Sequence, residues 1–277
     1  HHSEYNHTMD KLELLTGKAY LSHSSVNSYL DCSERYRLER IVKVPQENSW
    51  WLIGGSAFHT ATEYVDRDDM DTSEAWAKAW SEELAKVEDV GKLRAGGRAT
   101  KEYPNKEDGS WWTAKGEAMV DEYSKWVHNQ RQEGWEFFTT PTGDIAVEIP
   151  VDFILGGVNV KGYIDRIMVT PDGELIVIDL KTGSHTPASS AQLGVYALGV
   201  AHHFGVTPSI GAYYMARKGQ LSNTMSLLHY SEDTIGKWFA TVKRGIEEEM
   251  FVPHVTSMCG TCSVAPYCVA VGGKETK

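Results

Sequence analysis

The spacing of hydrophobic residues changes near residue 143, and this change divides the chain into two patterns. Before it, apolar side chains recur at the spacing of an amphipathic helix. After it, apolar and polar residues alternate as along a half-buried strand, in segments separated by further helical stretches. The helices are predicted over about residues 25–40, 50–65, 72–88, 111–133, 188–204 and 231–250. The strands are predicted over about residues 145–153, 158–169, 174–181, 209–216 and 224–230.

This order of elements predicts an α/β (α+β) fold, with a central mixed β-sheet flanked by helices and a helical insertion over about residues 66–135. No internal repeat or low-complexity linker divides the chain, so residues 20–277 are expected to form a single domain. The leading His1 and His2 indicate the end of an expression tag, and residues 1–10 are interpreted as that remnant and an N-terminal tail. The helix over 25–40 is expected to begin with Ser24 or Ser25 as its cap.

The net charge and the hydrophobic runs exclude some classes of protein. The chain of 277 residues has 27 Lys and Arg against 38 Asp and Glu, a net charge of −11, which argues against a protein that coats nucleic acid by bulk charge. A nucleic-acid enzyme stays compatible with this charge, because it needs only a local basic groove and its metal site adds carboxylates. No apolar run approaches the roughly 20 residues that span a bilayer. The N-terminus has no apolar stretch of signal-peptide type, so the cytoplasm is the expected location.

Acidic and basic side chains meet at the end of the third predicted strand. Asp179 and Lys181 are two residues apart there, so they lie on the same face. Asp165 lies on the preceding strand, opposite residue 178 in the simple register, or opposite Asp179 if Gly173 forms a bulge. In the second register the two aspartates share a face, with their Cβ atoms about 5 Å apart.

Two carboxylates so close repel each other unless a cation lies between them. Mg²⁺ or Mn²⁺ is the expected ion, because both prefer oxygen ligands. Lys181 would then neutralise the charge of a substrate phosphate, or orient or deprotonate an attacking water.

Each of these residues also has an ordinary structural interpretation. Asp-x-Lys occurs by chance in many chains, and its catalytic interpretation depends on the buried-type run Ile176–Ile178 before it. A charged pair beside such a run needs partners. His59 lies one helical turn before Glu63, and Gln192 and Tyr196 have the same spacing. Taken alone, such residues more often pack in a core than bind a ligand.

The sequence around these residues resembles the RecB-like branch of the PD-(D/E)xK nuclease superfamily. The similar segments are Gly162-Tyr163-Ile164-Asp165-Arg166, Ile178-Asp179-Leu180-Lys181-Thr182-Gly183 and Gln192-Leu193-Gly194-Val195-Tyr196-Ala197. The resemblance covers most of residues 24–268 apart from the helical insertion. It departs from the superfamily pattern at Ile164, where the eponymous proline is expected, and in having Asp rather than Glu as the second acid.

The resemblance implies a restriction-endonuclease-like core and a role for each matching residue. His59, Asp165 and Asp179 would be metal ligands, together with the backbone carbonyl of Leu180. Lys181 would be the catalytic lysine. Gln192 and Tyr196 would complete the catalytic set by contacting the DNA backbone or bracing the site.

Four cysteines are distributed unevenly along the chain. Cys259, Cys262 and Cys268 follow a C-x2-C-x5-C spacing, whereas Cys32 lies near the N-terminus. Three cysteines within ten residues of a cytoplasmic protein indicate a metal site or redox chemistry. Zinc sites usually combine two C-x2-C pairs, so one such pair with two further cysteines suits a [4Fe–4S] cluster better, with zinc and free thiols as alternatives.

The cysteine arrangement also resembles the iron–sulfur staple of AddB-type and CRISPR-associated exonucleases, in which a lone N-terminal cysteine completes a C-terminal trio. The resemblance implies a metal-dependent DNA exonuclease that acts on single-stranded DNA or duplex ends and carries a structural [4Fe–4S] cluster. Two other classes compete. One is a DNA-end-binding module for recombination or CRISPR adaptation, working with partner proteins and having secondary nuclease activity. The other is a zinc-stapled structural protein. The oligomeric state is not predicted.

Overall fold

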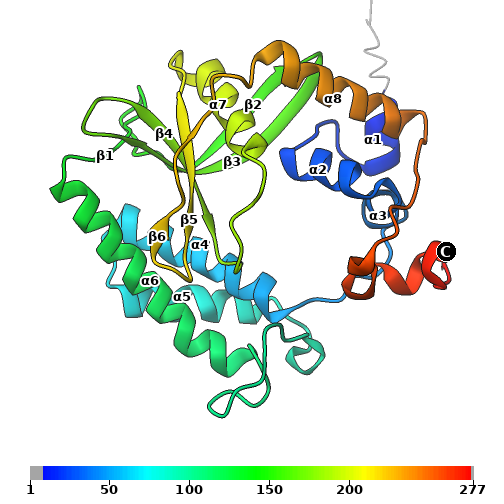
Figure 1. Cartoon of the computed structure of the whole chain (residues 1–277), viewed down its shortest axis with the longest axis horizontal. Helices are drawn as coiled ribbons and strands as arrows, with labels where there is room; N and C mark the ends of the chain where they lie inside the picture. The colour runs from blue at the N-terminus through cyan, green and yellow to red at the C-terminus, as the bar shows by residue number, and fades with distance from the viewer. Residues whose placement is uncertain (1–8, 276–277) are drawn as a thin grey trace, which may run out of the picture. The chain divides into compact units, whose positions relative to one another are not determined.

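The computed structural model describes residues 9–275, which form two compact units (Figure 1). Of the predicted tag remnant and N-terminal tail, residues 1–10, the first eight lie outside the described residues. The first unit comprises the described residues up to Gln46, Asp152–Gly162 and those from Tyr230 onward. The second unit comprises Glu47–Val151 and Tyr163–His229.

Three helices of the second unit pack together (Figure 1): α4 (Trp50–Asp68), α5 (Thr72–Ala85) and α6 (Gly109–Gln132). Each begins at a residue whose side chain accepts a hydrogen bond from the backbone of the first turn: Ser49, Asp71 and Asp108. α4 and α6 approach closely because Gly54 has no side chain; a Cβ there would lie 2.2 Å from the Trp112 ring. The helical insertion predicted over about residues 66–135 corresponds to α5, α6 and the end of α4.

A seven-stranded mixed sheet supports the site, with the strand order β1-β3-β4-β5-β6; β2 also pairs with β3, and β7 with β5. The strands are β1 (Glu136–Phe137), β2 (Val147–Leu155), β3 (Val158–Val169), β4 (Leu175–Lys181), β5 (Ile210–Met215), β6 (Gln220–Leu221) and β7 (Met225–Ser226). β4 and β5 are parallel, as expected for strands joined by a crossover helix, here α7 (Ala191–Phe204).

Side chains alternate between the two faces of β4. Ile176, Ile178 and Leu180 join the hydrophobic core formed with α4, α5 and α6. Asp179 and Lys181 therefore lie on the opposite face, where Lys181 donates a hydrogen bond to Gln192 of α7. The structure confirms the predicted fold class, a mixed sheet flanked by helices.

The β3–β4 hairpin has the bulged register. Arg166 pairs with Ile178 and Val169 with Leu175, so the next position places Asp165 opposite Asp179. Gly173 has φ +83°, a left-handed conformation that glycine adopts without the steric cost of a side chain. Its N–H donates to the Thr170 carbonyl, closing the turn.

The first unit contains α1 (Lys11–Thr16), α2 (His23–Asp31), α3 (Ser33–Arg37), a π-helical turn (Leu38–Val42) and α8 (Glu232–Glu247). Three short 3-10 helices end it: Ser257–Thr261, Ala265–Tyr267 and Val269–Val271. Leu38, Val44 and Val264 form a small buried cluster with Cys262 and Cys268 packed against it. The N-terminal and C-terminal segments of the chain thus share one core.

The structure corrects several predicted boundaries. The helix expected over 25–40 is broken at Cys32, whose backbone is extended, and its cap is Ser22, which exchanges hydrogen bonds with Ser25, rather than Ser24 or Ser25. α7 begins at Ala191, after a loop that contains Pro187. The strand expected over 224–230 is only β7, because the chain turns soon after Leu227 toward the cap of α8. Among the residues described, no helix is long and apolar enough to cross a membrane.

Candidate metal and catalytic centre

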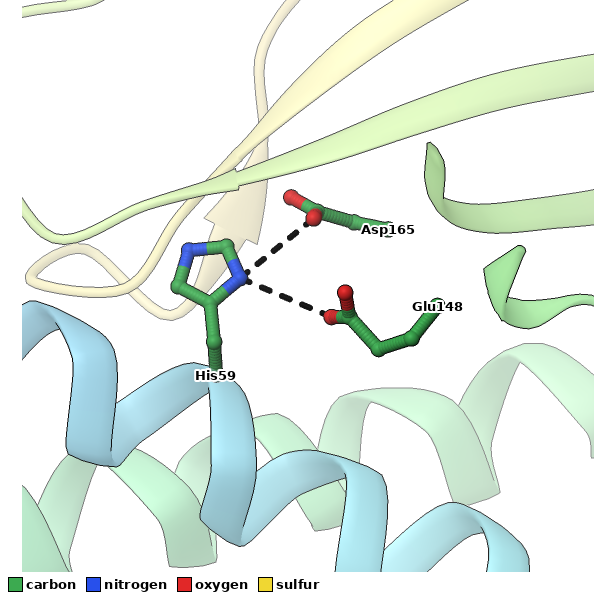
Figure 2. A group of neighbouring side chains, drawn as sticks. All are labelled: His59, Glu148 and Asp165. Atoms are coloured by element: carbon green, nitrogen blue, oxygen red, sulfur yellow. Dashed lines mark ion pairs between the residues drawn. The ribbon is translucent and has the colours of Figure 1, made fainter. Parts of the chain in front are cut away.

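Three side chains of the second unit converge on one point from three elements (Figure 2). His59 projects from α4, Glu148 from β2 and Asp165 from β3. His59 Nδ1 lies 3.4 Å from Asp165 Oδ1 and 3.6 Å from Glu148 Oε1. One ligand atom from each residue lies within 4.8 Å of the others, and a nitrogen with two carboxylate oxygens suits a divalent cation.

Glu148 was not among the predicted site residues. In the alternation of β2 it belongs with Pro150, Asp152 and Ile154, which are exposed. Its backbone is left-handed, with φ 50°, which is uncommon for a residue with a side chain. The buried Arg166 donates to its carboxylate at 3.3 Å. The irregular backbone and this contact hold Glu148 in the site, and strand alternation alone does not reveal either.

The two aspartates are buried side by side, as the second register predicts. Burial and the neighbouring charge of Asp165 raise the pKa of Asp179 above its usual range. Burial acts on Asp165 in the same direction, but the charge and hydrogen bond of His59, together with the hydrogen bonds from Asp179 and the Leu180 N–H, lower the pKa of Asp165 below its usual range. The two carboxylates thus do not ionise equally, and a cation would replace the proton on Asp179.

Asp179 has a buried oxygen, Oδ2, that faces the ammonium of Lys181. Lys181 Nζ lies 2.7 Å away and forms an ion pair with it, although no hydrogen bond of regular geometry reaches Oδ2. Asp165 Oδ2, by contrast, accepts from the Leu180 N–H at 2.7 Å. A buried carboxylate beside a second buried carboxylate fits a metal ligand, so the residues present fit a divalent ion.

A row of side chains continues from Lys181 to α7. Lys181 Nζ donates to Gln192 Oε1 at 3.1 Å, and Gln192 Nε2 donates to the Tyr196 hydroxyl at 3.1 Å. Gln192 and Tyr196 therefore hold the lysine beside Asp179. All predicted side chains of the centre lie in this region, whereas the role of the Leu180 carbonyl stays a prediction.

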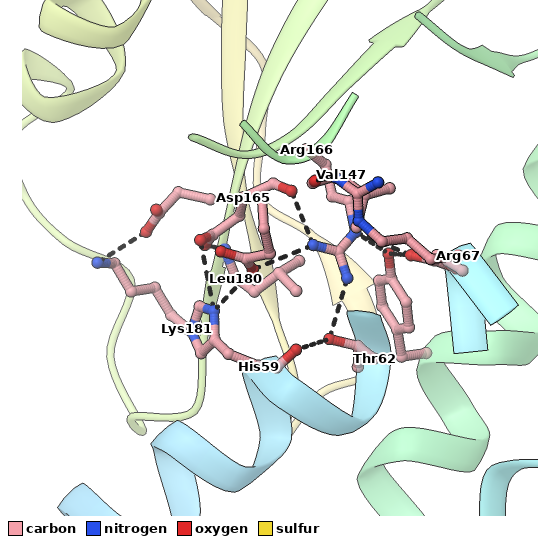
Figure 3. A network of polar contacts seen from close by, with 12 residues as sticks. His59, Thr62, Arg67, Val147, Asp165, Arg166, Leu180 and Lys181 are labelled. Atoms are coloured by element: carbon pink, nitrogen blue, oxygen red, sulfur yellow. Dashed lines mark hydrogen bonds and ion pairs between the residues drawn. The ribbon is translucent and has the colours of Figure 1, made fainter. Parts of the chain in front are cut away.

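Arg166 lies behind the centre at only 1% exposure and bonds residues from several elements (Figure 3). Its Nε donates to Asp66 and to the Tyr123 hydroxyl, both at 2.8 Å. Its Nη2 donates to Thr62, and its Nη1 to Glu148 and to the Asp165 carbonyl. This network connects α4 and α6 to two residues of the metal centre.

The four cysteines lie together in the first unit. They line one pocket of about 30 Å³, together with residues such as His254 and Val264. The His254 N–H points to Cys32 Sγ and the Thr256 N–H to Cys259 Sγ, both at 3.3 Å. Backbone donors of this kind stabilise thiolates. The cysteine set therefore fits a metal centre bound through sulfur.

The carboxylates and the histidine together fit a divalent cation, and the lysine lies beside them. The model of the PD-(D/E)XK nuclease superfamily matches residues 20–269, and the chain belongs to this superfamily. It is therefore a metal-dependent nuclease.

Two proteins of mycobacterial phages are similar to the chain over most of its length. The "Gene 69 protein" of Mycobacterium phage D29 is 34% identical, covering 89% of this chain and 95% of the phage protein. The "Gene 69 protein" of Mycobacterium phage L5 is 30% identical with the same coverage. A solved structure titled "Crystal structure of SSO0001" covers 94% of this chain and 96% of its own, at 15% identity and a TM-score of 0.36.

Metal affinity tests the converging trio. Because the nitrogen of His59 and the carboxylate of Glu148 both face Asp165, His59→Ala and Glu148→Gln are each expected to weaken Mn²⁺ binding by about tenfold or more. Isothermal titration with Mn²⁺ measures this. Exposed Glu117 of α6 offers a control, and Glu117→Gln is expected to bind Mn²⁺ as the wild type does. If His59→Ala lowers only the melting temperature, His59 is a core residue.

Proposed function

We propose that the protein is a metal-dependent DNA exonuclease that hydrolyses phosphodiester bonds of single-stranded DNA or of DNA ends and carries a structural [4Fe–4S] cluster. The observation that supports the catalytic part is the grouping of His59, Glu148 and Asp165 beside Asp179 and Lys181. A histidine nitrogen and carboxylate oxygens that converge on one point are ligands that a divalent cation accepts.

Each side chain of the centre has a role that follows from its chemistry. His59, Glu148, Asp165 and Asp179 would bind Mg²⁺ or Mn²⁺, which activates water and stabilises the leaving oxygen. Lys181 is positioned by Gln192 and paired with Asp179, so its ammonium neutralises charge on the phosphate that reacts. Tyr196 fixes the amide of Gln192 and, through it, the direction of the lysine.

Digestion of end-labelled DNA tests the proposal. Linear single-stranded and duplex DNA are incubated with Mg²⁺, with Mn²⁺ or with EDTA, and closed circular single-stranded DNA is the matched control. We expect linear DNA to be degraded from an end only when metal is present, and circular DNA to persist. Cleavage of the circle at the same rate would contradict an exonuclease, and intact linear DNA under every condition would contradict a nuclease.

The number and sequence spacing of the cysteines support a cluster. All four cysteines line the same pocket. A [4Fe–4S] cluster binds four thiolates, one at each iron. Zinc sites usually combine two C-x2-C pairs, whereas this chain has one such pair and two further cysteines.

Removal of one thiolate tests the cluster. Cys32→Ser is expected to lose most of the iron and to melt at a lower temperature, because a hydroxyl is a poor iron ligand and Cys32 lies far in sequence from the other three. Iron and zinc per chain and the melting temperature are measured on protein purified without oxygen. Val269→Ser, at an exposed residue next to Cys268, is the control and should keep its iron. Full iron content in Cys32→Ser would exclude Cys32 as a ligand.

A further inference from the structure

A pocket lies in the same unit as the metal centre, between α6 and the β5–β6 turn. This pocket has a volume of about 430 Å³, the size of a small-ligand site. Trp111, Lys115 and Met119 line it from α6, and Ala216, Arg217 and Lys218 from the turn. We call it the Trp111 pocket.

The backbone joins the Trp111 pocket to the catalytic strand. β5 runs parallel to β4, with Met215 beside Lys181. The N–H of Ala216 donates to the Lys181 carbonyl at 2.9 Å, and Arg217 Nε donates to the Thr182 carbonyl at 2.6 Å. One wall of the pocket is therefore bonded directly to the chain that carries the catalytic lysine.

Arg217 holds the aromatic wall of the pocket in place. Its guanidinium lies 4.9 Å from the Trp111 ring centroid and forms two hydrogen bonds with the Glu107 carboxylate, at 2.6 and 3.1 Å. Trp111 also packs edge-to-face against the fully buried Trp112. An indole fixed in this way, yet only half-buried, is a rigid surface on which a flat ring stacks at little entropic cost.

The charge of the pocket favours an anionic ligand. Lys115 and Lys218 are exposed, and neither belongs to an ion pair with the residues that the structure describes. Glu122 also lines the pocket, and Lys125 Nζ lies 3.7 Å from its carboxylate but closer to Asp121, at 3.1 Å. One acid of the lining therefore faces the two lysines, and the balance stays positive. Two unpaired lysines beside an aromatic ring match a nucleotide, which has a flat base and a phosphate on either side.

We infer that the Trp111 pocket binds one unpaired nucleotide of the DNA substrate, with its base on Trp111 and its phosphates near Lys115 and Lys218. The inference rests on the proposed action on DNA and specifies the substrate as a single strand. A base-paired nucleotide has both of its faces stacked on neighbouring bases, so its base does not reach an indole in a pocket.

Equilibrium binding in EDTA tests the pocket without any cleavage. A fluorescein-labelled oligothymidine and a hairpin duplex are titrated with each variant, and anisotropy is measured. Lys115→Glu with Lys218→Glu is expected to weaken single-strand binding by about tenfold or more. Lys86→Glu with Lys237→Glu makes the same charge change at residues 71% and 78% exposed outside the pocket, and its affinity should stay within about twofold.

The aromatic ring is tested separately. Trp111→Leu is expected to weaken single-strand binding by about tenfold, whereas Trp111→Phe, which keeps a ring, should bind nearly as the wild type does. Equal affinity of the pocket and control double variants, an equal loss of duplex binding, or no oligothymidine binding by the wild type would each overturn the inference. If the wild type cleaves DNA but the pocket variants bind single strands as tightly as it does, the pocket inference is refuted and the nuclease proposal stands. If the pocket variants bind more weakly but the wild type cleaves no DNA, the nuclease proposal is refuted and the pocket inference stands.

Discussion

Lys181→Ala and Asp179→Asn are each expected to lower the rate of DNA cleavage by at least about 100-fold. Lys181 is the cation closest to Asp179, at 2.7 Å, and Gln192 fixes its direction, so no neighbouring side chain replaces it. Asp179 supplies the buried oxygen that accepts no hydrogen bond, and an amide at this position binds a divalent ion poorly. Initial rates with saturating Mn²⁺ on end-labelled DNA measure both effects.

An exposed ion pair on the neighbouring strands provides matched controls. Asp152 and Lys161 lie 3.7 Å apart with 63% and 49% of their side chains exposed, so Asp152→Asn and Lys161→Ala should cleave as the wild type does. Asp179→Asn should also fold well. Burial beside Asp165 raises the pKa of Asp179, so without metal an amide there should leave the melting temperature unchanged or raise it. Wild-type cleavage by either site variant would refute the assigned roles.

The arrangement of Asp165 and Asp179 was predictable because it depends on local rules. Two residues on one strand share a face, and a glycine at the turn allows the bulge that sets the register. Gly173 adopts the left-handed conformation that this bulge requires, and Asp165 lies opposite Asp179 as a result. Both rules can be read from a short segment of sequence.

Glu148 and the partners of Arg166 were not predictable, because they depend on contacts between distant segments. Arg166 is 100 residues from Asp66 and 43 from Tyr123 in sequence, and no periodicity connects such positions. The one available signal was an arginine within the apolar run of a central strand, which has to be satisfied by buried partners. Glu148 left no such signal, because an acid on the polar side of a strand is ordinary.

The break at Cys32 shows a different limit. Helical spacing continues across it, and periodicity therefore predicted one helix over 25–40. The structure has an extended residue at Cys32 between α2 and α3, and its sulfur lines the pocket shared with the other three cysteines. In a continuous helix, the position of Cys32 in the helical repeat would decide where its side chain points. The break frees the side chain from that repeat, so tertiary contacts override the local pattern here.

Arg166→Ala is expected to lower the free energy of unfolding by about 3–5 kcal/mol. The substitution removes a guanidinium at 1% exposure from the Asp66 carboxylate, which is 3% exposed. Within residues 9–275, the Tyr123 hydroxyl is then the side-chain partner that Asp66 keeps. Most of this free energy comes from leaving the Asp66 carboxylate buried without its counterion. The lost attraction between the two charges contributes less. Urea unfolding measures the change, and Arg131→Ala is the control, because Arg131 is 55% exposed and should contribute less than about 1 kcal/mol.

Arg166 also positions Glu148 in the metal centre. A second variant, Arg166→Lys, separates this effect on metal binding from the effect of Arg166 on stability. Arg166→Lys keeps the positive charge, but an ammonium does not reach Asp66, Glu148 and Thr62 in the fixed directions of a guanidinium. We expect this variant to fold and to bind Mn²⁺ about tenfold more weakly. Adding Glu148→Gln should then cause little further loss, because Arg166→Lys removes the group that positions the Glu148 carboxylate and Glu148→Gln removes that same carboxylate. Full additivity of the two losses would show that Arg166 stabilises the fold without positioning Glu148.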